Sequence, residues 1–126
     1  MILCAVLLGG AQAAQADEMA ERRRALLLLS LSPEEFEGKP VAVRCPIFSA
    51  AVGDFSCAVV NSKIETVGSL YVNSDELPSD TKIELVERCT NRSVGPDCVA
   101  NLLVTIKNGI PMAQSLEWVP GSTPTD

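Results

Sequence analysis

The chain has 126 residues, of which 47% are apolar and 21% are charged, and its formal net charge is −6. This composition fits one small globular domain. The chain contains no histidine, which excludes Ser/His and Cys/His catalytic sites and histidine-ligated metal sites. With three Phe, one Tyr and one Trp, it has few large side chains to fill a core, so we expect cross-links to add stability.

Residues 1–16 are typical of a signal peptide. They are mostly apolar, carry no charge and end in Ala14-Gln15-Ala16, the small-x-small pattern that signal peptidase recognises. We predict cleavage before Asp17. The apolar stretch is shorter than the roughly eighteen residues that a membrane-spanning helix needs. The expected localisation is therefore periplasmic or secreted.

Four cysteines remain after this cleavage: Cys45, Cys57, Cys89 and Cys98. An even number in an exported chain favours disulfides over free thiols. Three pairings are possible, and we favour Cys45 with Cys57 and Cys89 with Cys98, because both intervals are short and each contains a turn-forming stretch. A four-thiolate zinc site and a redox-active pair both normally use closer Cys-x-x-Cys spacing. We therefore expect two structural disulfides, no metal and no other cofactor.

Residues 17–31 predict a helix that begins with acidic side chains, which suit the positive end of the helix dipole. Leu26 to Leu29 are four successive leucines, and these cannot all lie on one helical stripe. We favour a terminal helix that packs on the domain; the alternative is a helix that meets a membrane or a partner through residues 22–31. Ser32-Pro33-Glu34-Glu35 then predicts a capping box at the start of a short turn.

Alternating apolar residues predict an antiparallel hairpin over residues 41–48 and 55–59. Pairing Cys45 with Cys57 also brings the other inward residues together: Val43 with Val59, Ile47 with Phe55 and Ser49 with Gly53. One register thus satisfies the apolar pattern and the disulfide. Pro46 cannot donate a hydrogen bond to a neighbouring strand, so we expect an edge or a bulge there.

The middle of the chain predicts a third strand over residues 66–72 and a polar connection over residues 73–80. Residues 81–88 favour a helix, because Thr81 and Glu84 are spaced as a capping box. In that helix the inward face is formed by Ile83, Val86 and Cys89. A strand with Ile83 and Leu85 inward is the alternative.

The last two strands, residues 99–107 and 110–119, flank Asn108-Gly109, which is a strong signal for a two-residue hairpin turn. A two-residue turn would place the apolar side chains on opposite faces. A shift by one residue corrects this and gives the pairs Ile106 with Met112, Leu102 with Leu116 and Ala100 with Trp118. We therefore predict a longer loop or a bulge at Gly109. The tail, residues 120–126, is polar and is expected to be disordered.

Five strands, a short helix between the third and fourth, and the opening Glu37-Gly38-Lys39-Pro40-Val41-Ala42-Val43 resemble small exported bacterial domains of the OB-fold type. The resemblance covers residues 33–119 and implies a mainly β, five-stranded OB-like barrel over residues 32–119, with an N-terminal helix. It also implies a binding face on strands two and three. Nucleic acid is disfavoured, because a net charge of −6 repels phosphates and that face carries few basic groups.

Phe48 and Tyr71 are the candidate binding residues. Phe48 is placed on the face opposite the expected core, beside Ala50 and Val52, and would be the best sign of a contact surface. For both residues, and for Trp118, packing within the domain is the simpler interpretation, and contact with a ligand is the functional one. The polar connection over residues 73–80 contains the acidic residues Asp75, Glu76 and Asp80. They lack the spacing of a calcium loop, so we interpret them as a solvated surface.

The sequence as a whole favours a non-catalytic binding or interaction module, stabilised by two disulfides, whose partner is a protein or a component of the cell envelope. One alternative is a membrane-peripheral protein that docks through residues 22–31. Another is a small envelope enzyme or enzyme inhibitor that uses acidic side chains. The sequence leaves the oligomeric state open.

Overall fold

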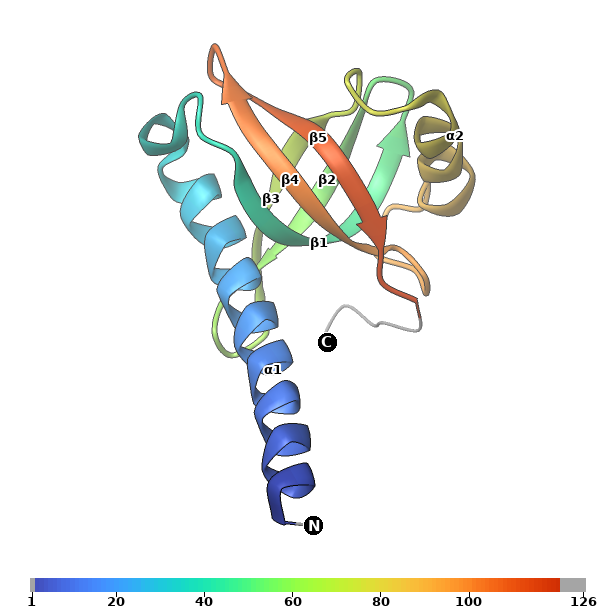
Figure 1. The fold of residues 1–126 in the computed structure, drawn as a ribbon. Coiled ribbons are helices and arrows are strands. Elements are labelled where there is room, and N and C mark those ends of the chain that lie inside the picture. Colours follow the sequence, from blue (N-terminus) through green and yellow to red (C-terminus); the bar gives the residue numbers. More distant parts are fainter. Residues whose placement is uncertain (1, 121–126) are drawn as a thin grey trace.

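The computed structural model describes the backbone of residues 2–120 and the side chains of residues 17–120. Its elements, in chain order, are α1 (Ile2–Leu31), the 3-10 turn η1 (Pro33–Phe36), β1 (Val41–Ala51), β2 (Asp54–Val60), β3 (Thr66–Asn73), α2 (Ser79–Arg88), β4 (Val99–Lys107) and β5 (Ile110–Trp118) (Figure 1). The strands form a closed barrel in the order β1-β2-β3-β5-β4. The predicted fold class is confirmed: a mainly β, five-stranded barrel with an N-terminal helix and a short helix between β3 and β4.

Two of the expected segments lie at the limits of this description. The side chains of residues 1–16, the expected signal peptide, are outside the described residues, although α1 includes the backbone from Ile2 onward. Of the expected tail, residues 121–126 also lie outside them. The expectations about cleavage and tail disorder therefore stay predictions.

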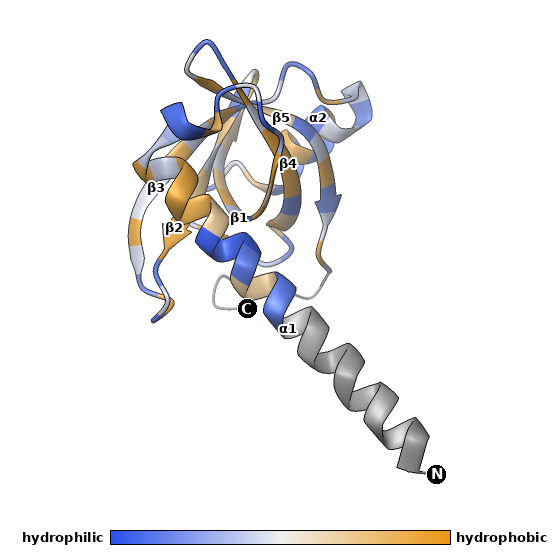
Figure 2. Ribbon diagram, turned by 60° about the vertical axis from the view of Figure 1, so that its left-hand side comes forward, coloured by the Kyte–Doolittle hydropathy of each residue, from blue (hydrophilic) through white to orange (hydrophobic). Residues whose placement is uncertain are grey.

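The carboxyl-terminal part of α1 packs against the barrel, as the favoured interpretation of the leucine run predicted. Leu26 and Leu29 are 1% and 0% exposed, whereas Leu28 and Leu31 are 41% and 68% exposed. The run therefore divides between a buried and a solvent-facing side, as the helical repeat requires. Figure 2 shows the apolar end of α1 against the strands, with a hydrophilic segment farther along the helix.

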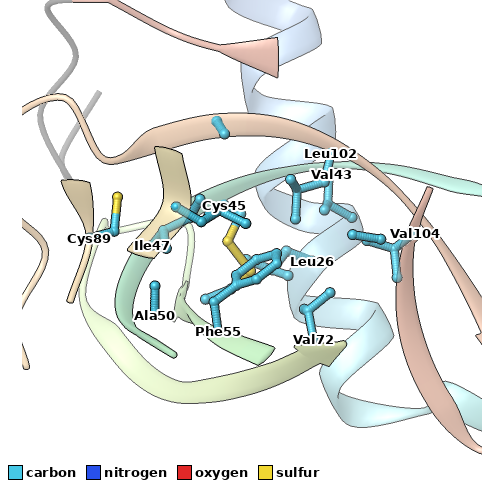
Figure 3. Packing of buried hydrophobic residues seen from close by; sticks show 14 of the residues in the cluster. Leu26, Val43, Cys45, Ile47, Ala50, Phe55, Val72, Cys89, Leu102 and Val104 are labelled. Carbon is cyan, nitrogen blue, oxygen red and sulfur yellow. A yellow bond between two sulfur atoms is a disulfide. The ribbon is translucent and has the colours of Figure 1, made fainter. Parts of the chain in front are cut away.

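The inward-facing side chains of the strands form the core, which fills the barrel. Phe55, Val43 and Val104 are fully buried there and lie with Leu26 of α1 around the Cys45–Cys57 disulfide (Figure 3). Both predicted disulfides are present: the Cα atoms are 5.1 Å apart in Cys45–Cys57 and 5.8 Å apart in Cys89–Cys98. These separations lie within the range that a disulfide normally spans.

The predicted register of the first hairpin is wrong by two residues. The structure pairs Ile47 with Cys57, not with Phe55. A bulge between Phe48 and Ala51 and a tight turn between β1 and β2 lengthen β1, and Ser49 adopts a positive φ of 52° inside this bulge. A shift by two residues leaves the side chains from Val43 to Phe48 on their predicted faces, because the strand repeat is two. The disulfide therefore still forms, now between residues that are diagonal across the two strands.

Pro46 does not lie on an edge strand, because β1 pairs with both β2 and β4. The N–H of the next residue, Ile47, donates to the carbonyl oxygen of Cys98 on the β4 side. The nitrogen of Pro46 therefore faces β2, and the β1–β2 pairs begin only at Ile47, so no ladder hydrogen bond is lost there. The bulge of β1 comes after Pro46, between Phe48 and Ala51.

The helix predicted between the third and fourth strands is confirmed as α2, but its start and its buried face differ. The helix begins at Ser79, and no side chain caps its first turn, so the predicted capping box from Thr81 is absent. Leu85 is buried in its middle, while Ile83 is 54% exposed. The capping box predicted at Ser32 is also absent, although Pro33 does begin η1.

The last hairpin combines both registers that the sequence allowed. Near the turn, β4 and β5 follow the two-residue register, in which Ile106 pairs with Pro111 rather than with Met112. Farther away, Leu102 pairs with Leu116 and Ala100 with Trp118, as predicted. The pairs Leu103↔Ser115 and Val104↔Ala113 leave Gln114 unpaired between them. The predicted bulge therefore exists, but it lies at Gln114 and not at Gly109.

Candidate binding surface

The two predicted contact residues, Phe48 and Tyr71, lie in one row on the outer face of the barrel. Phe48 of β1 pairs with Ser56 of β2, and Ser56 pairs with Tyr71 of β3. Paired residues point to the same side of a sheet. Their strand neighbours Ile47 and Cys57 are buried in the core, so Phe48, Ser56 and Tyr71 face outward. We call these three residues the aromatic row.

The members of the aromatic row differ in how far solvent reaches them. Tyr71 is 70% exposed, Phe48 is half-buried, and Ser56 between them is only 3% exposed. An exposure of 70% excludes the alternative that Tyr71 packs in the core. An exposed tyrosine ring offers an apolar face for stacking and a hydroxyl group for a hydrogen bond.

A covalent link stiffens the strands that carry this surface. Cys57 follows Ser56 directly in β2, and its disulfide to Cys45 ties β2 to β1 beneath the aromatic row. Both sulfur-bearing residues are fully buried. A surface held in place in this way loses little conformational entropy when it meets a partner.

The neighbours expected beside Phe48 lie elsewhere. Because of the bulge at Ser49, Ala50 turns into the core, where it is only 5% exposed. Val52 lies at the β1–β2 turn and is 92% exposed. It borders a hollow of about 460 Å³ against α2, which Ile83 and Val86 also line. This second apolar surface was missed, because the sequence did not show that the turn meets α2.

The acidic loop after β3 has a structural function. Lys107 Nζ lies 2.7 Å and 3.0 Å from the two carboxylate oxygens of Glu76, and Gln114 Nε2 donates to Glu76 Oε2 at 3.3 Å. The hydrogen bond from Lys107 lowers the pKa of Glu76. Among the residues whose side chains are described, no group of three potential metal ligands occurs. Glu76 therefore ties the β3–α2 loop to β4 and β5, close to the point where the barrel closes.

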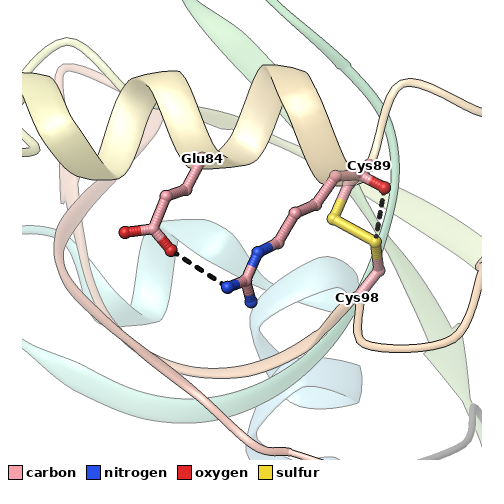
Figure 4. The surroundings of a disulfide bond; sticks show 4 residues. Glu84, Cys89 and Cys98 are labelled. Atoms are coloured by element: carbon pink, nitrogen blue, oxygen red, sulfur yellow. Dashed lines mark hydrogen bonds and ion pairs between the residues drawn. A yellow bond between two sulfur atoms is a disulfide. The ribbon is translucent and has the colours of Figure 1, made fainter.

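The second disulfide lies beside an aromatic contact that sequence reasoning also missed. The guanidinium of Arg88 lies 4.7 Å from the centre of the Trp118 ring and forms an ion pair of 3.5 Å with Glu84. Figure 4 shows this ion pair next to the Cys89–Cys98 bridge. Trp118 is half-buried against the core, so the packing interpretation holds for it. No local pattern could have indicated a contact between residues thirty positions apart.

The exposed side of α1 is a third candidate surface. Arg24, Leu28 and Leu31 are all exposed, and spacings of four and three residues place them on one side of the helix. Arg22 lies 4.0 Å from Glu18 in an exposed ion pair. The helices within the described part of the chain include none that is long and apolar enough to span a membrane.

Comparisons of this chain with protein-family models, with curated proteins and with solved structures found no match.

Proposed function

We propose that the protein is an exported, non-catalytic binding module with an OB-like barrel, which contacts a protein or another component of the cell envelope through the aromatic row. The observation that carries the proposal is that Phe48 of β1 and Tyr71 of β3 lie on the outer face of the barrel, on either side of Ser56 of β2. Strands two and three are the elements that OB-folds use for binding. An exposed tyrosine on such a face is a suitable anchor for a partner.

The disulfides support the proposed compartment. Two buried or nearly buried bridges, Cys45–Cys57 and Cys89–Cys98, suggest an oxidising environment outside the cytoplasm. The expected signal peptide, residues 1–16, points the same way. Cleavage before Asp17 leaves a shortened α1, whose first turns contain the acidic side chains of residues 17, 18 and 21. Acidic side chains at this end suit the helix dipole.

The chemistry of the aromatic row favours binding over catalysis. Phe48 and Tyr71 supply an apolar surface, and Tyr71 adds a hydroxyl group, whereas Ser56 between them is buried. None of the three is a carboxylate, an amine or an imidazole that would exchange a proton near neutral pH. The chain contains no histidine that could activate Ser56.

Site-specific photo-crosslinking in the exporting cell tests the proposal. A photoreactive phenylalanine analogue replaces Tyr71 in one variant and Ile83 in a control, because Ile83 is similarly exposed at 54% but lies on α2. We expect an adduct with an envelope component from position 71 and none from position 83. A chain that forms no adduct from position 71, or forms the same adduct from both positions, would contradict the proposal.

A second candidate function is peripheral membrane docking through α1, and the exposed line of Arg24, Leu28 and Leu31 favours it. Exposed leucines beside arginines are typical of helices that lie at a membrane surface. Co-sedimentation with vesicles of phosphatidylethanolamine and phosphatidylglycerol tests this function. Leu28→Ser and Leu31→Ser together should abolish co-sedimentation without unfolding the domain. Equal co-sedimentation of this variant and the native chain would exclude docking through α1.

A further inference from the structure

The β3 strand has one almost unpaired edge. On one side, β3 pairs with β2 from Thr66 to Asn73. On the other side, it meets β5 through a single pair, Asn73 with Met112. Within the described chain, the backbone hydrogen bonds outside regular elements include none from residues 66–72. Figure 2 shows the β2–β3 hairpin at the rim of the molecule, away from α2.

This edge has few of the features that normally prevent strands from joining. Proteins protect exposed edges with charged residues, prolines and bulges. Residues 66–73 contain no charged residue and no proline, and their one irregularity is a bulge at Val67, where the pairing with β2 shifts by one residue. By contrast, the facing edge of β5 contains Pro111, the bulge at Gln114 and the charged Glu117. β3 and β5 pair only at Asn73 and Met112. Of these two strands, β3 is therefore the one better suited to accept another strand.

The side chains along β3 are unusually apolar for an exposed strand. Val67 is 55% exposed and Tyr71 is 70% exposed. Gly68 and Val72 pair with the buried residues Val59 and Phe55 of β2. Val67 and Tyr71, which each precede one of these two positions, therefore point to the outer side of the sheet. Leu70, on the other side, is half-buried. An occupant of this edge would cover backbone groups and apolar side chains at once.

We propose that the occupant is β3 of a second copy of this chain, paired antiparallel about a twofold axis that passes through Ser69. In that register, Val67 of each copy lies opposite Tyr71 of the other. Pairs of an aromatic and a β-branched residue are among the favourable cross-strand pairs. Leu70 of each copy also lies opposite Gly68, which has no side chain to oppose it. The symmetry forms every such pair twice.

The charges beyond the ends of β3 fit the same register. Lys63 precedes the strand and Asp75 follows it, and the twofold axis at Ser69 brings Lys63 of one copy level with Asp75 of the other. The exposed Arg24 lines a hollow with Ile64 next to the start of β3 and adds positive charge there. Glu65 also lies at this end, where its carboxylate accepts a hydrogen bond from Asn61. An antiparallel partner thus places unlike charges near each other at both ends of the joined strands.

The proposed pairing contacts Tyr71 only from the edge of β3, through Val67 of the other copy, and leaves open the side of the aromatic row that faces away from the barrel. The aromatic rows of both copies would lie on one continuous sheet, where they remain available to another partner. The dimer and the partner of the aromatic row are therefore separate proposals that one measurement can distinguish.

Sedimentation of the full chain, purified after export from a bacterial host, tests the dimer. Val67→Lys and Tyr71→Glu should each raise the dimer dissociation constant at least tenfold, because each change is repeated by the symmetry. The double variant V67K/Y71E should restore dimerisation, since each lysine then lies opposite a glutamate of the other copy. Within one copy, the two positions are about 13 Å apart along the strand, too far for a direct ion pair. Ile83→Lys, on α2, is the control and should leave the dissociation constant unchanged.

Three results would each overturn this proposal. The first is a native chain that sediments as a monomer at every concentration. The second is a dimer that survives Val67→Lys, and the third is a double variant that dimerises no better than the single variants. Circular dichroism checks that each variant is folded, which is expected because both side chains are exposed. If the chain is monomeric but position 71 still cross-links to a different envelope component, the dimer is wrong and the proposed function stands.

Discussion

Replacement of Leu29 by alanine measures how much the packing of α1 on the barrel contributes to the free energy of unfolding. Leu29 is 0% exposed and lies in the core cluster with residues of the barrel. The substitution deletes three buried carbon atoms, which at about 0.8 kcal/mol each amounts to about 2.4 kcal/mol of lost transfer free energy. The cavity left behind raises the expected loss of unfolding free energy to about 3 kcal/mol. With a urea dependence of about 1.5 kcal/mol per M, the unfolding midpoint should fall by about 2 M.

The adjacent leucine provides a matched control. Leu28 is 41% exposed, so Leu28→Ala leaves no enclosed cavity and should cost about 1 kcal/mol or less. Unfolding of both variants is followed in urea by circular dichroism and by the fluorescence of Trp118, under non-reducing conditions. If the two variants lose the same free energy, α1 does not pack on the barrel as the structure has it, and the reasoning from burial is refuted.

Three further predictions address the cross-links, the acidic loop and export. Cys45→Ala with Cys57→Ala should lower the unfolding free energy by about 3 kcal/mol, the chain-entropy value for a loop with a sequence separation of 12; a midpoint equal to that of the native chain would contradict this. Lys107 lowers the pKa of Glu76, so the stability from this pair is present above the ordinary glutamate pKa and is lost as pH falls through the lowered value. In the Glu76→Gln variant, the urea midpoint should therefore fall less than in the native chain as the pH is lowered into the acidic range. The same fall in both proteins would exclude a contribution of the Glu76–Lys107 pair to stability. The intact mass of the exported protein should correspond to a chain that begins at Asp17 and takes up four alkyl groups only after reduction; five groups without reduction would place the chain in a reducing compartment.

Much of the fold follows from patterns that are local in the sequence. The alternation from Val41 to Phe48 predicted a strand and the face of each side chain, and both hold. The short cysteine intervals predicted both disulfides. The two candidate contact residues, Phe48 and Tyr71, were also recognised individually. Each of these features depends on a residue and its near neighbours, so one sequence contains the necessary information.

The pairing of the strands depended on the complete barrel. Two registers of the first hairpin place the same residues inward, because a shift by two residues preserves the side-chain repeat. The choice between them came from the bulge at Ser49, whose positive φ no local pattern indicated. That choice placed Phe48 and Tyr71 on either side of Ser56 and formed the aromatic row.

The sequence by itself determined which segments are strands, which cysteines are joined and, for the regular part of the first hairpin, which side chains face inward. The tertiary structure alone decided that Asn73 and Met112 close the barrel and that Arg88 lies over Trp118. It also decided that residues 66–72 of β3 pair with no strand other than β2 among the described residues. The physical reason is that backbone preferences and the period of two act between near neighbours. Contacts between distant segments are instead selected by the packing of the whole core, which no single segment encodes.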